Sequence, residues 1–356
     1  MNDLLILETT PKPRGTARAA AILGVAACLI AIAAGGAETD QYLSWSVTLA
    51  DSAEALNHFV NTETETFLER VNRRTRPITS VTELTTEFYL YFFQGIHSSR
   101  IRGWVNRAPE VDRFPDSSVS VFAYQRMSIY RDLTAFPFIL PMARTIRVGD
   151  VYFGTDKISH FFGFGRRYFQ RYLRHRDDGM DEEEAMRRVV LWGVALERKI
   201  VGGLVDGIFS HGDLEANFQG FLMARACCEG ETAHFRLADG QWRLARPFDL
   251  REYITPGFDE SYNNSHYTGM RKDRVLEILR EEYCPLRSEP EIEARFARYA
   301  NYPPSFSRRV IADYFAEKDG NPQREQSLDT ICVEEALELM PPPSVTQDNP
   351  GVSQDG

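Results

Sequence analysis

Polar side chains interrupt an otherwise apolar helical pattern between residues 209 and 221, which read FSHGDLEANFQGF. On a helix that begins after Ser210, Asp213 and Asn217 lie one turn apart, on one stripe with Gly220. Apolar side chains flank this stripe on both sides, so we expect it to face the rest of the protein. A carboxylate and an amide held away from water need partners or a ligand, which makes them candidates for a binding or catalytic site.

Two further features of this helix follow from its spacing. Glu215 and Gln219 lie roughly opposite the stripe and are expected to face water. The run Ser210-His211-Gly212-Asp213 is also typical of a capping box, and an acid in the first turn suits the helix dipole. Capping alone would explain Asp213, but not the amide one turn further along the helix.

A second acid lies in the preceding helical segment, residues 185–204, which read AMRRVVLWGVALERKIVGGL. Glu197 falls in the middle of its apolar face, and the basic residues take the opposite side. A lone carboxylate there would cost several kcal/mol or become protonated, so it should have a cationic or hydrogen-bonding partner. A purely structural buried ion pair would meet the same need.

The natural partners lie in residues 154–169, which read GTDKISHFFGFGRRYF. We expect Thr155 to cap this helix, with Asp156, His160 and Arg167 on one face and Lys157 beside them. That broad side also carries other polar residues, so a solvated face remains an alternative.

These residues predict one of three functions. In the first, a buried network fixes three helices, and Lys157 and Arg167 bind an anionic lipid or cell-wall head group. The members of this binding or network set are Asp156, Lys157, His160, Arg167, Glu197, Ser210, His211, Asp213 and Asn217.

The second function is hydrolysis by a metal or by acid–base catalysis. His160, Glu197 and Asp213, with His211 or Asp206, include side-chain types that bind divalent metals or orient a base. No spacing matches a known metal motif and no nucleophile is evident, so the sequence assigns no cofactor. The third function is a purely structural envelope component whose hairpin and acidic surface serve a protein partner that the sequence does not identify.

The motifs D156-K157-x-x-H160-F161, Glu197 and S210-x-G-D213-x-x-A-N217-x-x-G220 resemble those of two envelope families. These are the VanZ-like membrane proteins and the YfiM-like predicted periplasmic lipoproteins. The resemblance covers residues 155–225 and implies an envelope setting and a shared polar cluster, but no reaction. Unlike the VanZ pattern, the glutamate is not followed by an evident glutamine and arginine, and these helices carry too many charges to span a bilayer.

The N-terminus predicts export. Basic residues precede an uncharged run over residues 19–37, which gives way to Glu38 and Asp40. Residues 1–37 are therefore expected to be a signal peptide or a membrane anchor, which would place the rest in the periplasm or on the outer face of the inner membrane, near a lipid or cell-wall ligand. In an oxidising compartment Cys284 and Cys332 form one plausible disulfide, with buried free thiols as the alternative.

The elements that position these residues are mainly α-helical. We expect a multi-helix globular ectodomain with an N-terminal helical region at 38–150, a three-helix polar-cluster core at 151–230 and C-terminal helices within 231–340. An Asp239-Gly240 turn predicts a small β-hairpin at 234–245, and residues 341–356 are expected to be a disordered tail. The 356-residue chain has a net charge of −10 and a pI of about 5.3, so it has no basic field of the kind that drives nucleic-acid binding.

Overall fold

The computed structural model describes residues 37–95, 99–132, 140–198, 207–319 and 328–332. Nearly all of the expected signal or anchor segment lies outside them, as do the expected tail and Asp206. Among the described residues, no helix combines the length and the apolar character needed to cross a membrane.

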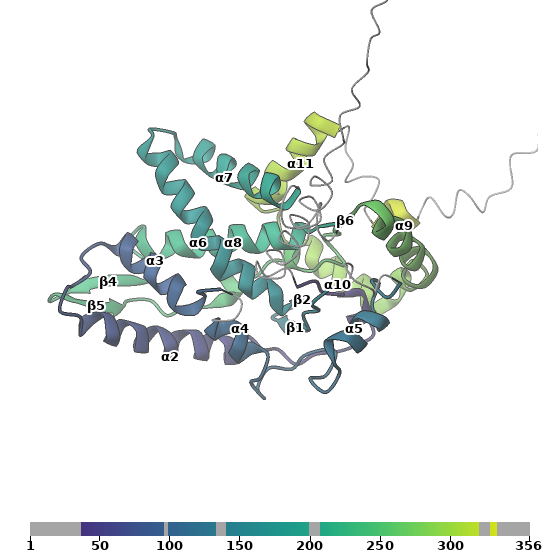
Figure 1. Ribbon diagram of the computed structural model, residues 1–356, viewed down its shortest axis with the longest axis horizontal. Helices are drawn as coiled ribbons and strands as arrows, with labels where there is room; N and C mark the ends of the chain where they lie inside the picture. The colour runs from purple at the N-terminus through teal and green to yellow at the C-terminus, as the bar shows by residue number, and fades with distance from the viewer. Residues whose placement is uncertain (1–36, 96–98, 133–139, 199–206, 320–327, 333–356) are drawn as a thin grey trace, which may run out of the picture.

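The fold is mainly helical, as expected (Figure 1). Its α-helices are α2 (Ala53–Asn72), α3 (Val81–Phe92), α4 (Arg100–Val105), α5 (Val121–Met127), α6 (Thr155–Asp177), α7 (Glu182–Leu196), α8 (His211–Cys228), α9 (Gly269–Ile278), α10 (Pro290–Ala300) and α11 (Phe306–Asp319). Its antiparallel strand pairs are β1 (Thr145–Val148) with β2 (Val151–Gly154), β3 (Ile208–Phe209) with β6 (His266–Tyr267), and β4 (Phe235–Ala238) with β5 (Gln241–Leu244).

The hairpin β4–β5 turns at Asp239 and Gly240, as the sequence predicts. Both residues have positive φ, 52° and 72°, which is the conformation that a two-residue turn of this kind requires. The hairpin is part of the fold rather than a free arm, because Trp242 is 6% exposed and exchanges backbone hydrogen bonds with the Asn72 side chain at the end of α2. Figure 1 shows it lying between α2 and α3.

The sequence does not predict the hairpin β1–β2, since residues 97–150 lack clean periodicity, which indicates short helices and loops. Helices α4 and α5 fit that interpretation, but Thr145–Val148 forms a strand. The expected boundary between 150 and 151 lies inside this hairpin, between its turn at Gly149 and Asp150 and strand β2. The first hydrophobic core cluster contains buried residues from Ala53 to Phe315, and a second core cluster includes Tyr42, Leu279, Leu328 and Ile331.

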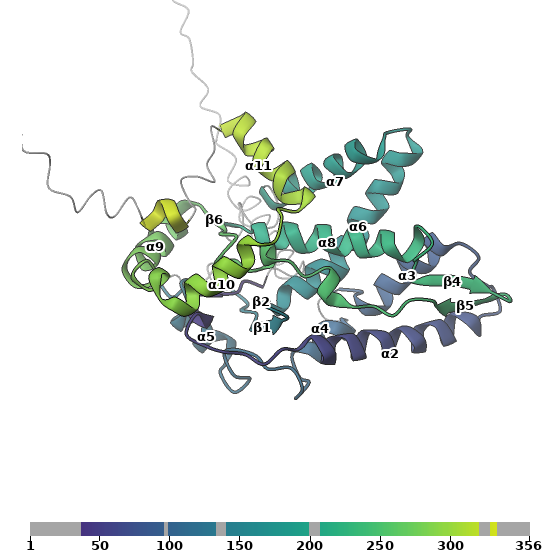
Figure 2. The same cartoon turned by 180° about the vertical axis from the view of Figure 1, so that it is seen from behind.

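Helices α6 and α8 cross at very short range. A Cβ atom at Gly220 would lie 2.0 Å from the backbone oxygen of Phe161, and one at Gly165 would lie 2.7 Å from the backbone carbon of Gly220. Two glycines therefore allow the two backbones to touch. This contact sets the first turns of both helices side by side, with α7 and α11 packed together above α8 (Figures 1 and 2).

Candidate functional site

The ammonium group of Lys157 lies at the centre of a buried cluster of acids. Its Nζ atom is 2.6 Å from Asp156 Oδ2, 2.8 Å from Asp213 Oδ1 and 2.8 Å from Glu260 Oε1. The Lys157 side chain is 0% exposed and the three carboxylates are 1–6% exposed. Three segments distant in sequence thus meet at one positive charge: the start of α6, the start of α8 and the loop before β6.

Asp213 links the lysine to a histidine. Its Oδ2 atom lies 3.2 Å from His160 Nε2, and the other ring nitrogen of His160 lies 3.2 Å from Asn217 Oδ1. His160 and Asn217 are 3% and 4% exposed. The polar stripe of α8 therefore faces α6, as the spacing predicts, and each polar group on it has a partner there.

The start of α8 explains why Asp213 is free to make these contacts. The Ser210 hydroxyl accepts a hydrogen bond from the Asp213 backbone N–H at 3.0 Å, which is the first half of a capping box. The second half is supplied by Glu197, whose Oε1 accepts from the Ser210 N–H at 3.2 Å. Because Glu197 takes that bond, the Asp213 carboxylate can face Lys157 and His160. The Ser210 hydroxyl donates to Glu260 Oε1.

The acids of the cluster differ in their affinity for protons. Burial opposes ionisation of Asp213, but His160 and Lys157 outweigh it and lower the pKa of Asp213. Burial, with the nearby charge of Asp213, raises the pKa of Glu197 well above its ordinary value. Burial opposes the charged form of Lys157, yet the surrounding acids raise its pKa. We therefore assign Lys157 and Asp213 as charged and Glu197 as protonated.

The pKa of Glu260 gives a pH prediction. Burial, only partly offset by Lys157, raises this pKa from 4.5 to about 7. The folded state therefore holds a proton that the unfolded state releases, and we expect stability to fall as pH rises from 4.5 to 7, by up to about 1.4 kcal/mol per pH unit. Asp40, whose pKa burial raises to about 6, adds a slope of the same sign.

The measurement is the urea midpoint of the wild type and of Glu260→Gln between pH 4.5 and 8. The wild-type curve should fall more steeply across this window, because the amide of the variant cannot release a proton. The difference between the two curves isolates Glu260 from Asp40. Parallel curves would show that Glu260 has an ordinary pKa in the folded protein.

Glu260 is the member of the cluster that the sequence analysis missed. It lies in a loop after a short 3-10 helix, where no periodicity marks an inward side chain. One signal was present at Gly212, where a Cβ atom would lie 2.9 Å from Lys157 Cε and 3.0 Å from Glu260 Cγ. The glycine in the Ser210-x-Gly-Asp213 motif thus marks the approach of a third segment.

Three expectations for the site residues are wrong. Arg167 is exposed and stacks on Phe164, whose other neighbour is the ring of His160, so an aromatic ring separates Arg167 from the cluster. Thr155 does not cap α6, because it is the first helical residue and its hydroxyl donates to Asn106 Oδ1 at 3.2 Å; Gly154 holds the N-cap position.

His211 is the third. Its ring stacks on that of His266, with ring centroids 4.9 Å apart, and lies beside Phe209. Burial and the nearby His266 lower the pKa of His211 well below its ordinary value. His211 therefore packs among aromatic rings rather than in the charged cluster.

The expected water-facing side of α8 is also buried. Glu215 is 0% exposed and Gln219 is 5% exposed. Glu215 accepts hydrogen bonds from Gln219, from Thr255 at 2.9 Å, and from Ser305 and Ser307 just before and in α11. The C-terminal segment covers this arc, and hydroxyl donors stabilise the acid there. A helix projection could not show that later residues pack on it.

Within the described ranges, no group of three or more His, Cys, Asp and Glu side chains is arranged to hold a metal ion. Of the three expected metal ligands His160, Glu197 and Asp213, only His160 and Asp213 are in direct contact. The position between the carboxylates that a cation would take is filled by Lys157 Nζ. The donor set therefore fits an internal ammonium ion.

Comparison of the chain with models of protein families, with curated proteins and with solved structures finds no match.

Proposed function

We propose that this chain is an exported cell-envelope protein in which the Lys157 network is a scaffold. The network consists of Asp156, Lys157, His160, Glu197, Ser210, Asp213, Asn217 and Glu260. The observation that supports a scaffold is the complete burial of Lys157 among three carboxylates from separate segments. A lipid or cell-wall head group would have to displace one of these acids to reach the ammonium group.

A disulfide supports the exported location. Cys284, after the π-helical end of α9, is joined to Cys332, the pair that the sequence suggests. The bridge joins residues 328–332 to the end of α9, and both of its cysteines pack against the second core cluster, in which Leu328 and Ile331 are buried. Disulfides persist in oxidising compartments such as the periplasm. The charge pattern of residues 1–37 and the resemblance to envelope families support the same location.

We expect reduction of this disulfide to lower the free energy of unfolding by about 2–4 kcal/mol, since the bridge closes a long loop. The measurement is urea unfolding with and without dithiothreitol, and the Cys284→Ser/Cys332→Ser variant should match the reduced protein. Cys227→Ser/Cys228→Ser is the control, because both of these cysteines are free thiols. Dithiothreitol should lower the free energy of unfolding of this variant as much as that of the wild type. Equal stability of oxidised and reduced wild type would remove this support for export.

Export itself is tested by fractionation of native cells. We expect the protein in the envelope or periplasmic fraction, with Cys284 and Cys332 oxidised when free thiols are trapped at lysis. Recovery in the cytosol with both thiols reduced would contradict the proposal.

Acid–base hydrolysis is the second candidate. One observation favours it: the pKa of Asp213 is lowered while those of Glu197 and Glu260 are raised, a separation typical of acid–base pairs. Assays with nitrophenyl phosphate and a nitroanilide test it. If the network is only a scaffold, the wild type should turn over neither substrate. If the wild type turns one over and a folded Asp213→Asn variant does not, the result would favour hydrolysis.

A further inference from the structure

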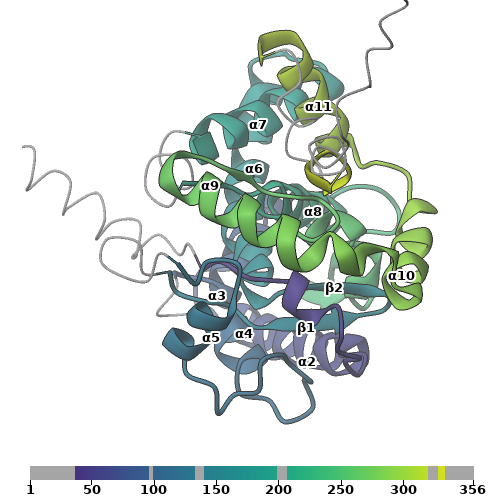
Figure 3. The same cartoon turned by 90° about the vertical axis from the view of Figure 1, so that its right-hand side faces the viewer.

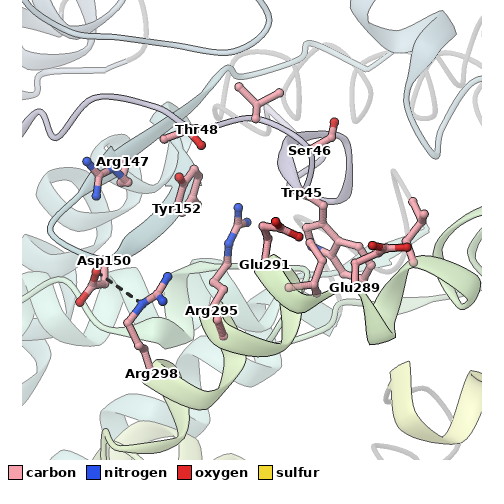
Figure 4. Close-up of a pocket in the computed structure, with 14 residues that line it drawn as sticks. Trp45, Ser46, Thr48, Arg147, Asp150, Tyr152, Glu289, Glu291, Arg295 and Arg298 are labelled. Carbon is pink, nitrogen blue, oxygen red and sulfur yellow. Dashed lines mark ion pairs between the residues drawn. The ribbon is translucent and has the colours of Figure 1, made fainter.

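An open pocket lies away from the Lys157 network, and residues 45–48, the hairpin β1–β2 and helix α10 line it (Figure 4). Figure 3 shows the ribbon of β2 next to that of α10. The volume of the pocket is about 690 Å³, within the range of sites that hold small molecules. Trp45 and Tyr152 are 4% and 7% exposed and give it aromatic walls, and Ile292 adds an aliphatic one.

Arg295 is the buried charge of this pocket. It is 5% exposed, and its guanidinium carbon lies 3.8 Å from the centre of the Tyr152 ring. Its Nη2 atom donates to the Ser44 carbonyl at 3.3 Å, whereas its buried Nη1 atom has no hydrogen-bond partner among the described residues. Figure 4 shows the guanidinium group directed into the space between the two sides of the pocket. An anionic oxygen in that space would supply the missing acceptor.

The other charged groups of the pocket are divided by sign. Arg147 and Arg298 lie on one side of Arg295, and Glu289 and Glu291 lie on the other (Figure 4). Asp150 pairs with Arg298 at 3.6 Å, and the guanidinium group of Arg147 binds the backbone oxygens of Leu49 and Gly149. Arg147 and Arg298 thus already have partners. Neither Glu289 nor Glu291 forms an ion pair with another residue that lines the pocket.

We propose that this pocket binds a small zwitterion, with its carboxylate or phosphate on Arg295 and its ammonium group toward Glu289 and Glu291. The aromatic and aliphatic walls would contact its apolar part. A free short peptide, such as a fragment of cell-wall material, carries both charges, and so does a phosphoethanolamine lipid head group. This inference goes beyond the proposed scaffold and does not depend on it, because none of the network residues lines the pocket.

The test is calorimetric titration of the intact protein with alanyl-alanine and with O-phosphoethanolamine, and separately with acetate, inorganic phosphate and ethylamine. We expect at least one zwitterion to bind about tenfold or more tightly than its anion alone. Binding of the dipeptide alone identifies a peptide source, and binding of phosphoethanolamine alone identifies a lipid source. Failure of both zwitterions to bind would overturn the proposal.

Variants locate the binding. Arg295→Gln should weaken zwitterion binding about tenfold or more, after circular dichroism has shown that it is folded. Glu291 is exposed, so Glu291→Gln should fold normally and reduce affinity for the zwitterion but not for the anion. Glu293→Gln, on the same helix but outside the pocket, is the matched control and should bind like the wild type. Unchanged zwitterion affinity in Glu291→Gln would contradict the proposed orientation, and unchanged affinity in both pocket variants would overturn the site.

Discussion

Replacement of Lys157 with Met should lower the free energy of unfolding by about 3–5 kcal/mol. The methionine fills a similar volume, so the loss comes from charge rather than from a cavity. Without the ammonium group, Asp156, Asp213 and Glu260 face one another in a site that is closed to water. The fold must then leave carboxylates unpaired or bind protons that the unfolded chain does not bind.

The measurement is urea unfolding at pH 8, where the carboxylates of the unfolded chain are ionised. Arg167→Met is the matched control, because it removes a positive charge from an exposed position on the same helix. We expect that control to change stability by no more than about 0.5 kcal/mol. A Lys157→Met variant as stable as the control would show that the buried ammonium group is not what holds the three segments together.

Replacement of Gly220 with Ala should destabilise the fold by about 3 kcal/mol or more, or prevent folding. The new methyl group would lie 2.0 Å from the Phe161 oxygen and 2.7 Å from the Phe161 carbon. Both are backbone atoms in the second turn of α6, so relief requires the two helices to separate. Separation would also move Asp213 and Asn217 away from Lys157 and His160, and would disturb the bond from the Tyr89 hydroxyl to the Gly220 carbonyl.

Gly103→Ala is the matched control, since Gly103 also lies in a helix. Its Cβ atom would meet only the far end of the Arg107 side chain, at 3.0 Å. Alanine favours the helix by about 1 kcal/mol over glycine, so this variant should be as stable as the wild type or slightly more stable. The measurement is the urea midpoint of both variants. Equal effects at Gly103 and Gly220 would contradict the close helix contact.

Much of the scaffold could be predicted from the sequence, because helical spacing reports which side chains share a face. The stripe on α8 places Asp213 and Asn217 toward α6, and the apolar surroundings of Glu197 require it to be buried with a partner. That partner is the Ser210 backbone N–H rather than a cation. Spacing could show the need for a partner, but not which group from another segment meets it.

The remainder depends on contacts between distant segments. Glu260 reaches Lys157 from a loop, and Ser305 and Ser307 cover Glu215, which the projection of α8 placed in water. Both pairings join residues 90 or more positions apart and leave no periodic signal in the sequence. The pocket around Arg295 has the same origin, since its walls come from Trp45, Tyr152 and α10.

The coupling between Lys157 and Asp213 tests the central claim most directly. In a double-mutant cycle of Lys157→Met and Asp213→Asn, unfolded by urea at pH 8, we expect Asp213→Asn to destabilise the wild type, because it removes a partner of both Lys157 and His160. In the Lys157→Met background the same change should cost about 1–3 kcal/mol less, or even stabilise, because it removes a carboxylate that has lost its main cation. If the destabilisation of the double variant equals the sum of the two single-variant destabilisations to within about 0.5 kcal/mol, the result would contradict a scaffold built on this buried ion pair.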